Sequence, residues 1–308
     1  KIHKKQIDRS AGRKERLVSG GICGKMSTRF FSGLTPSFGF PYPHRPEARQ
    51  NTRTRFFGET AVAEDYEMNF DVAFYSERGG RAVNEDAVSV SGMPERLLAL
   101  AADGLGGMGD GEEASRDAVS YLAELTQCPV EEDTLCDAIS EENRRILRMH
   151  ESGKQMMTTI AVLWADAEQA LAATVGDTRL YQFRNGRIVF QSTDHSVAQL
   201  AVFSGEITQA QLRGYPGRNR LLRALGAEQE VQVELNVLDA CPGDRFLLCS
   251  DGFWELITET EMLYWNATDT AAAWLERMKT LADARCGFRG DNHSAIAVIA
   301  AKEAEYAG

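Results

Sequence analysis

The sequence predicts an α+β fold in which antiparallel sheets stack face to face and carry helices on their outer sides. Strand-like and helix-like runs occur in groups and do not alternate strictly, which disfavours a doubly wound parallel sheet. Several short apolar runs end at a turn or a charge cluster. The pair Asn185 and Gly186 separates two of them, and both positions of a two-residue hairpin turn need a positive φ. Hairpin-connected strands are therefore expected.

Three strand-like runs open the patterned part of the chain: FDVAFYS, DAVSV and LLALAA. A helix is expected from Gly111 onward, because Glu112 and Glu113 give it an acidic first turn. Apolar residues at helical spacing continue it: Ala114, Ala118, Leu122 and Leu125. A second helix is expected over residues 133–150, where apolar residues form one stripe.

The second half begins with a predicted meander over residues 158–192: TTIAVLWA, QALAATVG, TRLYQF and RIVFQS. Residues 196–228 interrupt this rhythm with short helical pieces, a capping-box candidate from Thr208 to Gln211 and the stretch RGYPGRN. We expect this insertion to be a mobile flap over a site. Strand RFLLCS, a helical stretch from Thr258, a helix over residues 271–285 and strand SAIAVIAA follow.

Residues 1–68 differ from the remainder of the chain. They are basic, rich in Gly, Ser and Pro, and show no sustained period, so we expect a flexible extension. Residues 69–302 form one predicted domain, and residues 303–308 a tail. This domain is acidic enough to give the whole chain a net charge of −11, which argues against nucleic-acid binding and favours divalent cations.

The cysteines and the apolar runs limit where the protein is expected to work. The six cysteines are scattered without a CxxC pair, so neither a disulfide framework nor a zinc ribbon is indicated. Such cysteines suit the reducing cytoplasm. No apolar run reaches the roughly 18 residues that a membrane span requires, so we expect no membrane association.

Carboxylates recur at the ends of predicted core strands. Asp103 and Asp251 each end an apolar strand and precede a glycine, which permits a sharp turn and close backbone approach. Asp291 precedes another apolar run, and Glu85 and Asp86 follow Arg81 in GGRAVNEDA. Each alone fits an ordinary acidic turn. Together they would repel one another unless cations neutralised them, and an oxygen-only ligand set suits Mg²⁺ or Mn²⁺.

Two rival motifs are weaker. Gly104, Gly106 and Gly109 match a dinucleotide-binding turn, but the surrounding carboxylates would repel a pyrophosphate. The spacing from Cys23 to Arg29 matches that of cysteine-dependent phosphatases, but it lies in the unpatterned extension.

The ordered motifs resemble those of the PPM (PP2C-like) metal-dependent Ser/Thr protein phosphatases, in their bacterial form. The motifs span about residues 70–301: GGRAVNEDA, AADGLGGMGDGEEAS, TTIAVLWA with TVGDTRLYQFRNG, STDHS, CSDGFWELIT and DNHSAIAVIA. The resemblance implies a central β-sandwich of two antiparallel sheets flanked by helical layers. A two-metal site is expected at one end of this sandwich.

The same resemblance implies roles for individual residues. Asp103 would bridge two Mn²⁺ or Mg²⁺ ions, with the Gly104 carbonyl, Asp251 and Asp291 completing the shell. Glu85 and Asp86 would act mostly through bound waters. Bacterial relatives also hold a weaker third ion, to which Asp177 and Asp251 correspond. Arg81 matches the family's phosphate-binding arginine, since a guanidinium presents paired donors to two phosphate oxygens.

The implied activity is hydrolysis of phosphoserine and phosphothreonine in proteins by a metal-activated water, without a phosphoenzyme. Arg81, Asp103 and Asp251 are the expected catalytic residues. Expected partners are phosphorylated proteins, a cognate Ser/Thr kinase and its targets, and we expect a cytoplasmic monomer. The alternative is a noncatalytic PPM-like binding or regulatory module, although every principal metal carboxylate is retained.

One departure from the family concerns the leaving-group proton. Leu105 and Met108 stand where relatives carry a histidine, so the sequence assigns no general acid. His195, in the TDHS motif, is expected to be a structural histidine. His293 either tunes the site or is an exposed turn histidine.

Overall fold

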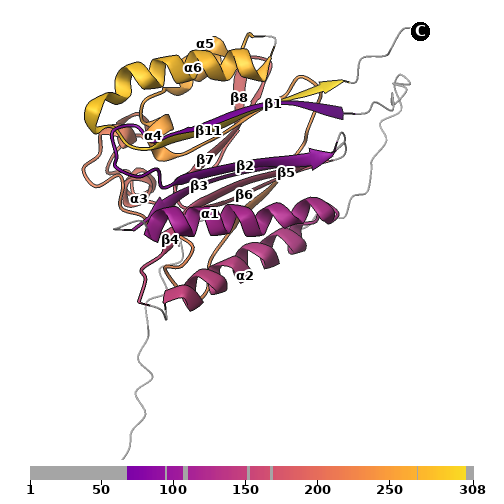
Figure 1. Ribbon diagram of the computed structural model, residues 1–308. Helices are drawn as coiled ribbons and strands as arrows, with labels where there is room; N and C mark the ends of the chain where they lie inside the picture. Colours follow the sequence, from indigo (N-terminus) through magenta and orange to yellow (C-terminus); the bar gives the residue numbers. More distant parts are fainter. Residues whose placement is uncertain are drawn as a thin grey trace, which may run out of the picture. The chain divides into compact units, whose positions relative to one another are not determined.

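Two antiparallel β-sheets packed face to face form the centre of the protein (Figure 1). The computed structural model describes residues 68–93, 96–106, 110–150, 153–166, 169–268 and 270–302. The predicted extension before Met68, the tail from residue 303 and Met108 lie outside the described residues.

The strand order places both chain ends of the domain on neighbouring strands. The five-stranded sheet runs β1 (Met68–Glu77), β11 (His293–Lys302), β10 (Arg245–Cys249), β7 (Arg179–Arg184) and β8 (Arg187–Gln191). The six-stranded sheet runs β2 (Asp86–Met93), β3 (Arg96–Leu105), β5 (Ile160–Ala165), β6 (Ala170–Val175) and β9 (Glu234–Leu238), with β4 (Met157–Thr158) paired to β3.

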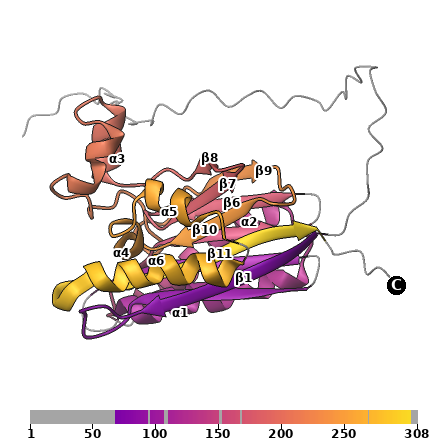
Figure 2. The same cartoon turned by 90° about the horizontal axis from the view of Figure 1, so that it is seen from above.

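Helices cover the outer face of each sheet (Figure 1). On the six-stranded sheet lie α1 (Asp110–Leu122), the 3₁₀ turn η1 (Ala123–Gln127) and α2 (Glu132–His150). On the five-stranded sheet lie α4 (Asp251–Trp254), α5 (Glu259–Trp265), α6 (Ala271–Cys286) and the 3₁₀ turn η3 (Gly287–Arg289). Figure 2 shows α3 (Val197–Phe203) set apart from the sheets, in the segment that also holds η2 (Gln209–Gly214).

Alternation along β3 explains how one strand serves two cores. Leu97, Ala99 and Ala101 face the other sheet, where they pack with residues such as Phe246. Leu98, Leu100 and Ala102 face the opposite way and pack under α1 and α2. Because both faces are covered, the strand is apolar throughout and lacks the apolar-polar alternation of a half-exposed strand.

The sandwich of antiparallel sheets between helical layers is confirmed, with local differences. Asn185 and Gly186 adopt φ values of 51° and 69°, and the capping box at Thr208 forms. The predicted first helix ends at Leu122, so Leu125 belongs to η1. Strand β9 was not anticipated, because its sequence ELNVL carries a charge and an amide among few apolar residues.

One end of the sandwich gathers several strand junctions. The start of β2 pairs with the end of β3, and the end of β10 pairs with the starts of both β7 and β11. These junctions therefore lie together, although they are far apart in sequence. Within the described residues, no helix combines the length and the apolar character needed to cross a membrane.

Candidate metal and phosphate site

Strand ends bring five aspartates to this end of the sandwich. Asp86 begins β2, and Asp103 lies opposite it near the end of β3. Asp251 is the first residue of α4, directly after β10 and Ser250. Asp291 lies just before β11, and Asp177 lies in the turn between β6 and β7. Five separate segments thus contribute acidic side chains to one region.

Two glycines let these segments approach closely. A Cβ atom on Gly104 would lie 2.0 Å from the carbonyl oxygen of Gly111. A Cβ atom on Gly252 would lie 2.0 Å from the carbonyl oxygen of Asn292. Neither glycine has a positive φ, so space and not backbone conformation demands glycine here.

Asp251 is the electrostatic centre of the cluster. Burial raises its pKa, and the charges of Asp291 and Glu255 raise it further. Burial also raises the pKa values of Asp103 and Asp177 well above their usual range, with the charge of Asp251 as the next contribution in each case. The carboxyl groups of Asp103 and Asp251 each affect the pKa of the other. The carboxyl groups are therefore close enough to resist simultaneous ionisation.

Asp86 leaves one buried oxygen without a protein partner. Its Oδ2 accepts a hydrogen bond of 2.7 Å from Ser250 Oγ, whereas Oδ1 has no hydrogen-bond partner among the described residues. The side chain is 5% exposed, and burial raises its pKa. An unpaired buried carboxylate oxygen is costly, so an acceptor site open to a cation explains its retention.

The donor set fits hard divalent cations. It consists of carboxylate oxygens with nearby main-chain carbonyls, the chemistry that Mg²⁺ and Mn²⁺ prefer. In the described residues, however, no three His, Cys, Asp or Glu side chains stand at the mutual spacing of a finished site. Asp291 is turned toward Arg81, which supplies the positive charge at that position. The carboxylates are gathered at one end of the sandwich without that mutual spacing.

Arg81 lies at the exposed edge of the cluster. Its Nη2 donates to Asp291 Oδ2 over 2.6 Å, and its side chain is 55% exposed. The charge of Asp291 raises the pKa of Arg81, with smaller contributions from Asp251 and Glu85. The structure pairs this arginine with Asp291 and not with Glu85 or Asp86. Within the described residues Arg81 makes this one side-chain hydrogen bond, so further N–H groups of its five donors remain available.

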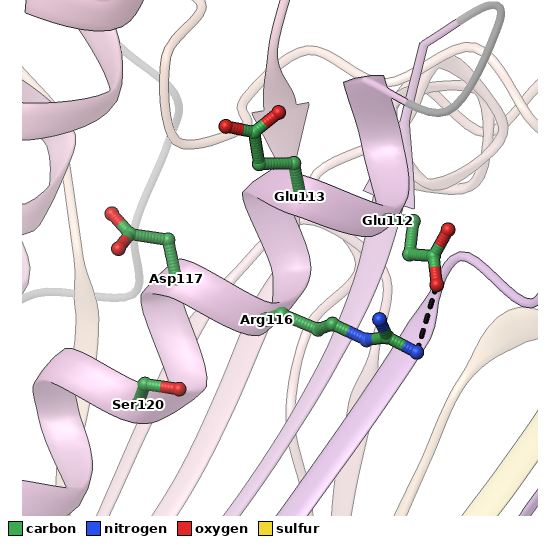
Figure 3. Close-up of a pocket in the computed structure, with 5 residues that line it drawn as sticks. All are labelled: Glu112, Glu113, Arg116, Asp117 and Ser120. Atoms are coloured by element: carbon green, nitrogen blue, oxygen red, sulfur yellow. Dashed lines mark ion pairs between the residues drawn. The ribbon is translucent and has the colours of Figure 1, made fainter.

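Glu85 and the first turn of α1 lie next to the aspartate cluster. Burial raises the pKa of Glu85, and the nearby charge of Glu112 adds to this effect. Figure 3 shows Glu112 paired with Arg116 at 2.7 Å. A surface hollow of about 450 Å³ continues along α1 beyond this pair, where it is also lined by Glu113, Asp117 and Ser120.

His195 has a structural role. It is buried, its Nδ1 accepts a hydrogen bond of 3.0 Å from the Gly176 amide, and its own amide donates to the Gly176 carbonyl at 2.8 Å. Its Nε2 lies 3.4 Å from Glu234. These contacts hold the turn that carries Asp177, which agrees with the structural histidine predicted from the sequence.

His293 is not an exposed turn residue, so that alternative was wrong. It is 2% exposed as the first residue of β11, and its Nδ1 lies 3.1 Å from Tyr75 Oη. Burial lowers its pKa. Leu105 is the last residue of β3 and offers no proton, which leaves the expected histidine position apolar.

Two further residues were missed by sequence reasoning. Asn292 is buried; its Nδ2 donates to the carbonyls of Arg78 (2.7 Å) and Val83 (3.0 Å), and its Oδ1 accepts from the Glu85 amide (2.9 Å). Arg218 reaches Glu255 from the 196–228 segment, with 2.7 Å between Nη2 and Oε2. No local pattern could reveal these contacts, because the partners lie far apart in the chain.

Comparison with known proteins agrees with this arrangement. The family model described as protein phosphatase 2C matches residues 75–289. The serine/threonine phosphatase stp of Listeria welshimeri is 34% identical over 201 residues, covering 61% of this chain and 80% of that protein. The crystal structure of Mycobacterium tuberculosis PstP/Ppp is 30% identical, with a TM-score of 0.68 over 75% of this chain and 98% of that chain.

A metal-bound neighbour makes the likeness more specific. The catalytic domain of PstP in complex with two manganese ions is 29% identical, with a TM-score of 0.66 over 76% of this chain and 99% of that chain. The fold agrees over most of both chains. The chain therefore belongs to the protein phosphatase 2C family of metal-dependent serine/threonine protein phosphatases.

Proposed function

We propose that the carboxylate cluster is the metal centre at which this phosphatase hydrolyses phosphoserine and phosphothreonine in proteins. Asp103 and Asp251 are its central ligands, joined by Asp291 and the Gly104 carbonyl. Glu85 and Asp86 act mostly through waters. The unpartnered Oδ1 of buried Asp86, beside carboxyl groups whose pKa values are raised first by burial and then by one another's charge, is the observation that carries this proposal.

The cations, when bound, make hydroxide available near neutral pH and offset charge on the phosphoryl oxygens. Arg81 binds two phosphate oxygens and fixes the line along which water attacks phosphorus. No side chain becomes phosphorylated. With Leu105 at the end of β3, we assign no side chain as the donor of the leaving-group proton.

The finer assignments follow from the same cluster. We propose two Mn²⁺ or Mg²⁺ ions. Asp177 and Asp251 would hold a weaker third ion, because both are buried in the cluster and the charge of Asp251 contributes to the raised pKa of Asp177. We propose that the 196–228 segment is a flap over the site, since Arg218 within it lies in the field of Asp251 and Asp291.

The proposal extends to the biological setting. Phosphorylated targets of a cognate Ser/Thr kinase are the expected substrates, and the protein is proposed to act as a monomer. A cytoplasmic location is consistent with the free thiols of Cys128, Cys136, Cys241, Cys249 and Cys286.

Phosphopeptide turnover with a Mn²⁺ titration tests the proposal. Asp251→Asn should lower kcat by at least about 10³-fold, because it removes a ligand of the proposed centre. Asp133→Asn, at an exposed aspartate in the first turn of α2, is the matched control. Calorimetric titration should show weaker Mn²⁺ binding only for the first variant. A folded wild type without Mn²⁺- or Mg²⁺-stimulated turnover would favour the noncatalytic module.

A further inference from the structure

A fully exposed aromatic side chain lies beside the Arg81 loop. Phe288 is 100% exposed in the 3₁₀ turn η3, between Gly287 and Gly290. Covering a phenyl ring is favourable, and aromatic residues are frequent anchors in binding interfaces. A single exposed phenylalanine alone would prove nothing, so its position relative to Arg81 matters.

Main-chain contacts fix that position. The Gly80 amide donates to the Gly290 carbonyl over 3.0 Å. A Cβ atom on Gly80 would lie 2.4 Å from the Phe288 carbonyl oxygen, and one on Gly79 would lie 2.1 Å from the Asp291 carbonyl oxygen. Gly80 directly precedes Arg81, so the phenyl group and the guanidinium project from two backbones in direct contact.

Asn292 makes this pair of loops a rigid platform. Its buried amide binds the carbonyls of Arg78 and Val83 and the amide of Glu85, so it holds the loop that carries Arg81 at both ends. Asn292 follows η3 by only three residues. Because the platform is already ordered, a substrate that contacts Phe288 loses little further conformational entropy of the protein.

The reach of a peptide suits this arrangement. An extended peptide advances about 3.3–3.6 Å per residue. If its phosphate binds at Arg81, a side chain one or two positions away can therefore reach the ring of Phe288. The Arg81 loop and η3 also carry the exposed side chains of Arg78, Val83 and Arg289, and Arg81 is paired with Asp291. Covering the exposed ring favours an apolar flanking residue, because it removes apolar surface from water.

We propose that Phe288 is a specificity-determining residue, which selects phosphoserine and phosphothreonine sites with a large apolar residue one or two positions away. This inference rests on the proposed function, because it takes the phosphate to bind at Arg81. The occupant of the exposed ring is the flanking segment of the phosphoprotein substrate itself.

A pair of phosphopeptides tests this selection. The two peptides differ only in carrying Leu or Lys on both sides of the phosphoserine, and the readout is the ratio of their kcat/KM values. Wild type should favour the Leu peptide about tenfold, and Phe288→Ala should reduce this ratio to about twofold, mainly by raising KM for the Leu peptide. Phe288→Leu should retain an intermediate preference, because it keeps an apolar side chain.

The control is an exposed aromatic residue elsewhere. Tyr264 on α5 is 72% exposed, and Tyr264→Ala should leave the ratio as in wild type. A wild type without preference, or an equal preference in Phe288→Ala, would overturn the inference while leaving the phosphatase activity intact. If wild type hydrolysed neither peptide, the proposed function would fail first, and the inference with it.

Discussion

Two arginine-aspartate pairs in this protein differ in burial: Arg179 with Asp194 is buried, and Arg81 with Asp291 is exposed. Arg179 and Asp194 are 2% and 1% exposed and share two hydrogen bonds, of 2.7 Å and 2.6 Å. Arg179 also donates to Tyr181 Oη, and its guanidinium lies 3.6 Å from the ring centre of Trp254. Arg81 and Asp291 are 55% and 41% exposed and share one contact of 2.6 Å.

The difference lies in unused bonding capacity. A guanidinium has five N–H donors, and Arg179 donates hydrogen bonds to protein groups inside the core. Arg81 makes one ion pair within the described residues, at a surface crowded with carboxylates. A buried pair in which every guanidinium nitrogen is hydrogen-bonded holds the fold, whereas an exposed pair with spare donors can exchange its partner for a phosphate or a cation.

Breaking the buried pair should have the largest effect. Arg179→Ala leaves Asp194 buried without its cation, so the free energy of unfolding should fall by about 3–5 kcal/mol. Urea unfolding followed by fluorescence measures this. A loss below about 1 kcal/mol would show that the pair adds little to stability.

Breaking the exposed pair should affect activity and not stability. Arg81→Ala should lower kcat/KM for a phosphopeptide by about 10²-fold, because it removes the phosphate clamp. The free energy of unfolding should change by less than about 1 kcal/mol. Arg144, 56% exposed and paired with Glu141, provides the matched control Arg144→Ala. Equal kinetics for both variants would contradict the clamp.

A third pair, Arg145 with Glu142, lies between these extremes. Glu142 is fully buried, its Oε2 accepts from Arg145, and its Oε1 has no hydrogen-bond partner in the part of the chain described. Burial, aided by the charge of Asp117, raises the pKa of Glu142 to about 8. The folded state therefore holds this proton more tightly than the unfolded state, so Glu142 costs stability progressively as pH rises from about 4.5 to about 8.

Glu142→Gln removes this titration. The variant should be more stable than wild type by about 1–3 kcal/mol at pH 8.5 and nearly equal to it at pH 4.5. Thermal unfolding at several pH values is the measurement, with Glu141→Gln at the exposed neighbour as the control. A difference that does not depend on pH would show that Glu142 is ionised normally.

Loosening the Arg81 loop should have the smallest effect. Asn292→Ala removes the three hydrogen bonds that hold this loop, so kcat/KM should fall by about tenfold. This loss is smaller than the roughly 10²-fold loss expected if a catalytic group moved by about 1 Å. Inhibition by inorganic phosphate should weaken, whereas Mn²⁺ affinity should stay within about twofold. Equal losses of phosphate and Mn²⁺ affinity would indicate general damage instead of a positioning role.

The regular elements could be predicted because their signals are local. The hairpin at Asn185 and Gly186, the capping box at Thr208 and the apolar strands β3 and β10 each depend on a few neighbouring residues. Strand β9 was not predicted, because the sequence ELNVL has no clear strand pattern of its own. Its hydrogen bonds with β6 place it in the sheet. The helix α4 was read as a turn because only four residues form it.

By itself, the sequence determined which strands end in a carboxylate followed by a small residue, and hence that oxygen ligands would be abundant. Only the tertiary structure decided that Asp86 and Asp103 face each other, that Arg81 pairs with Asp291, and that Asn292 ties down a loop more than 200 positions earlier. The physical reason is range. Backbone propensity acts over a few residues, whereas the charge and hydrogen-bond partners of this site are set by packing between distant strand ends.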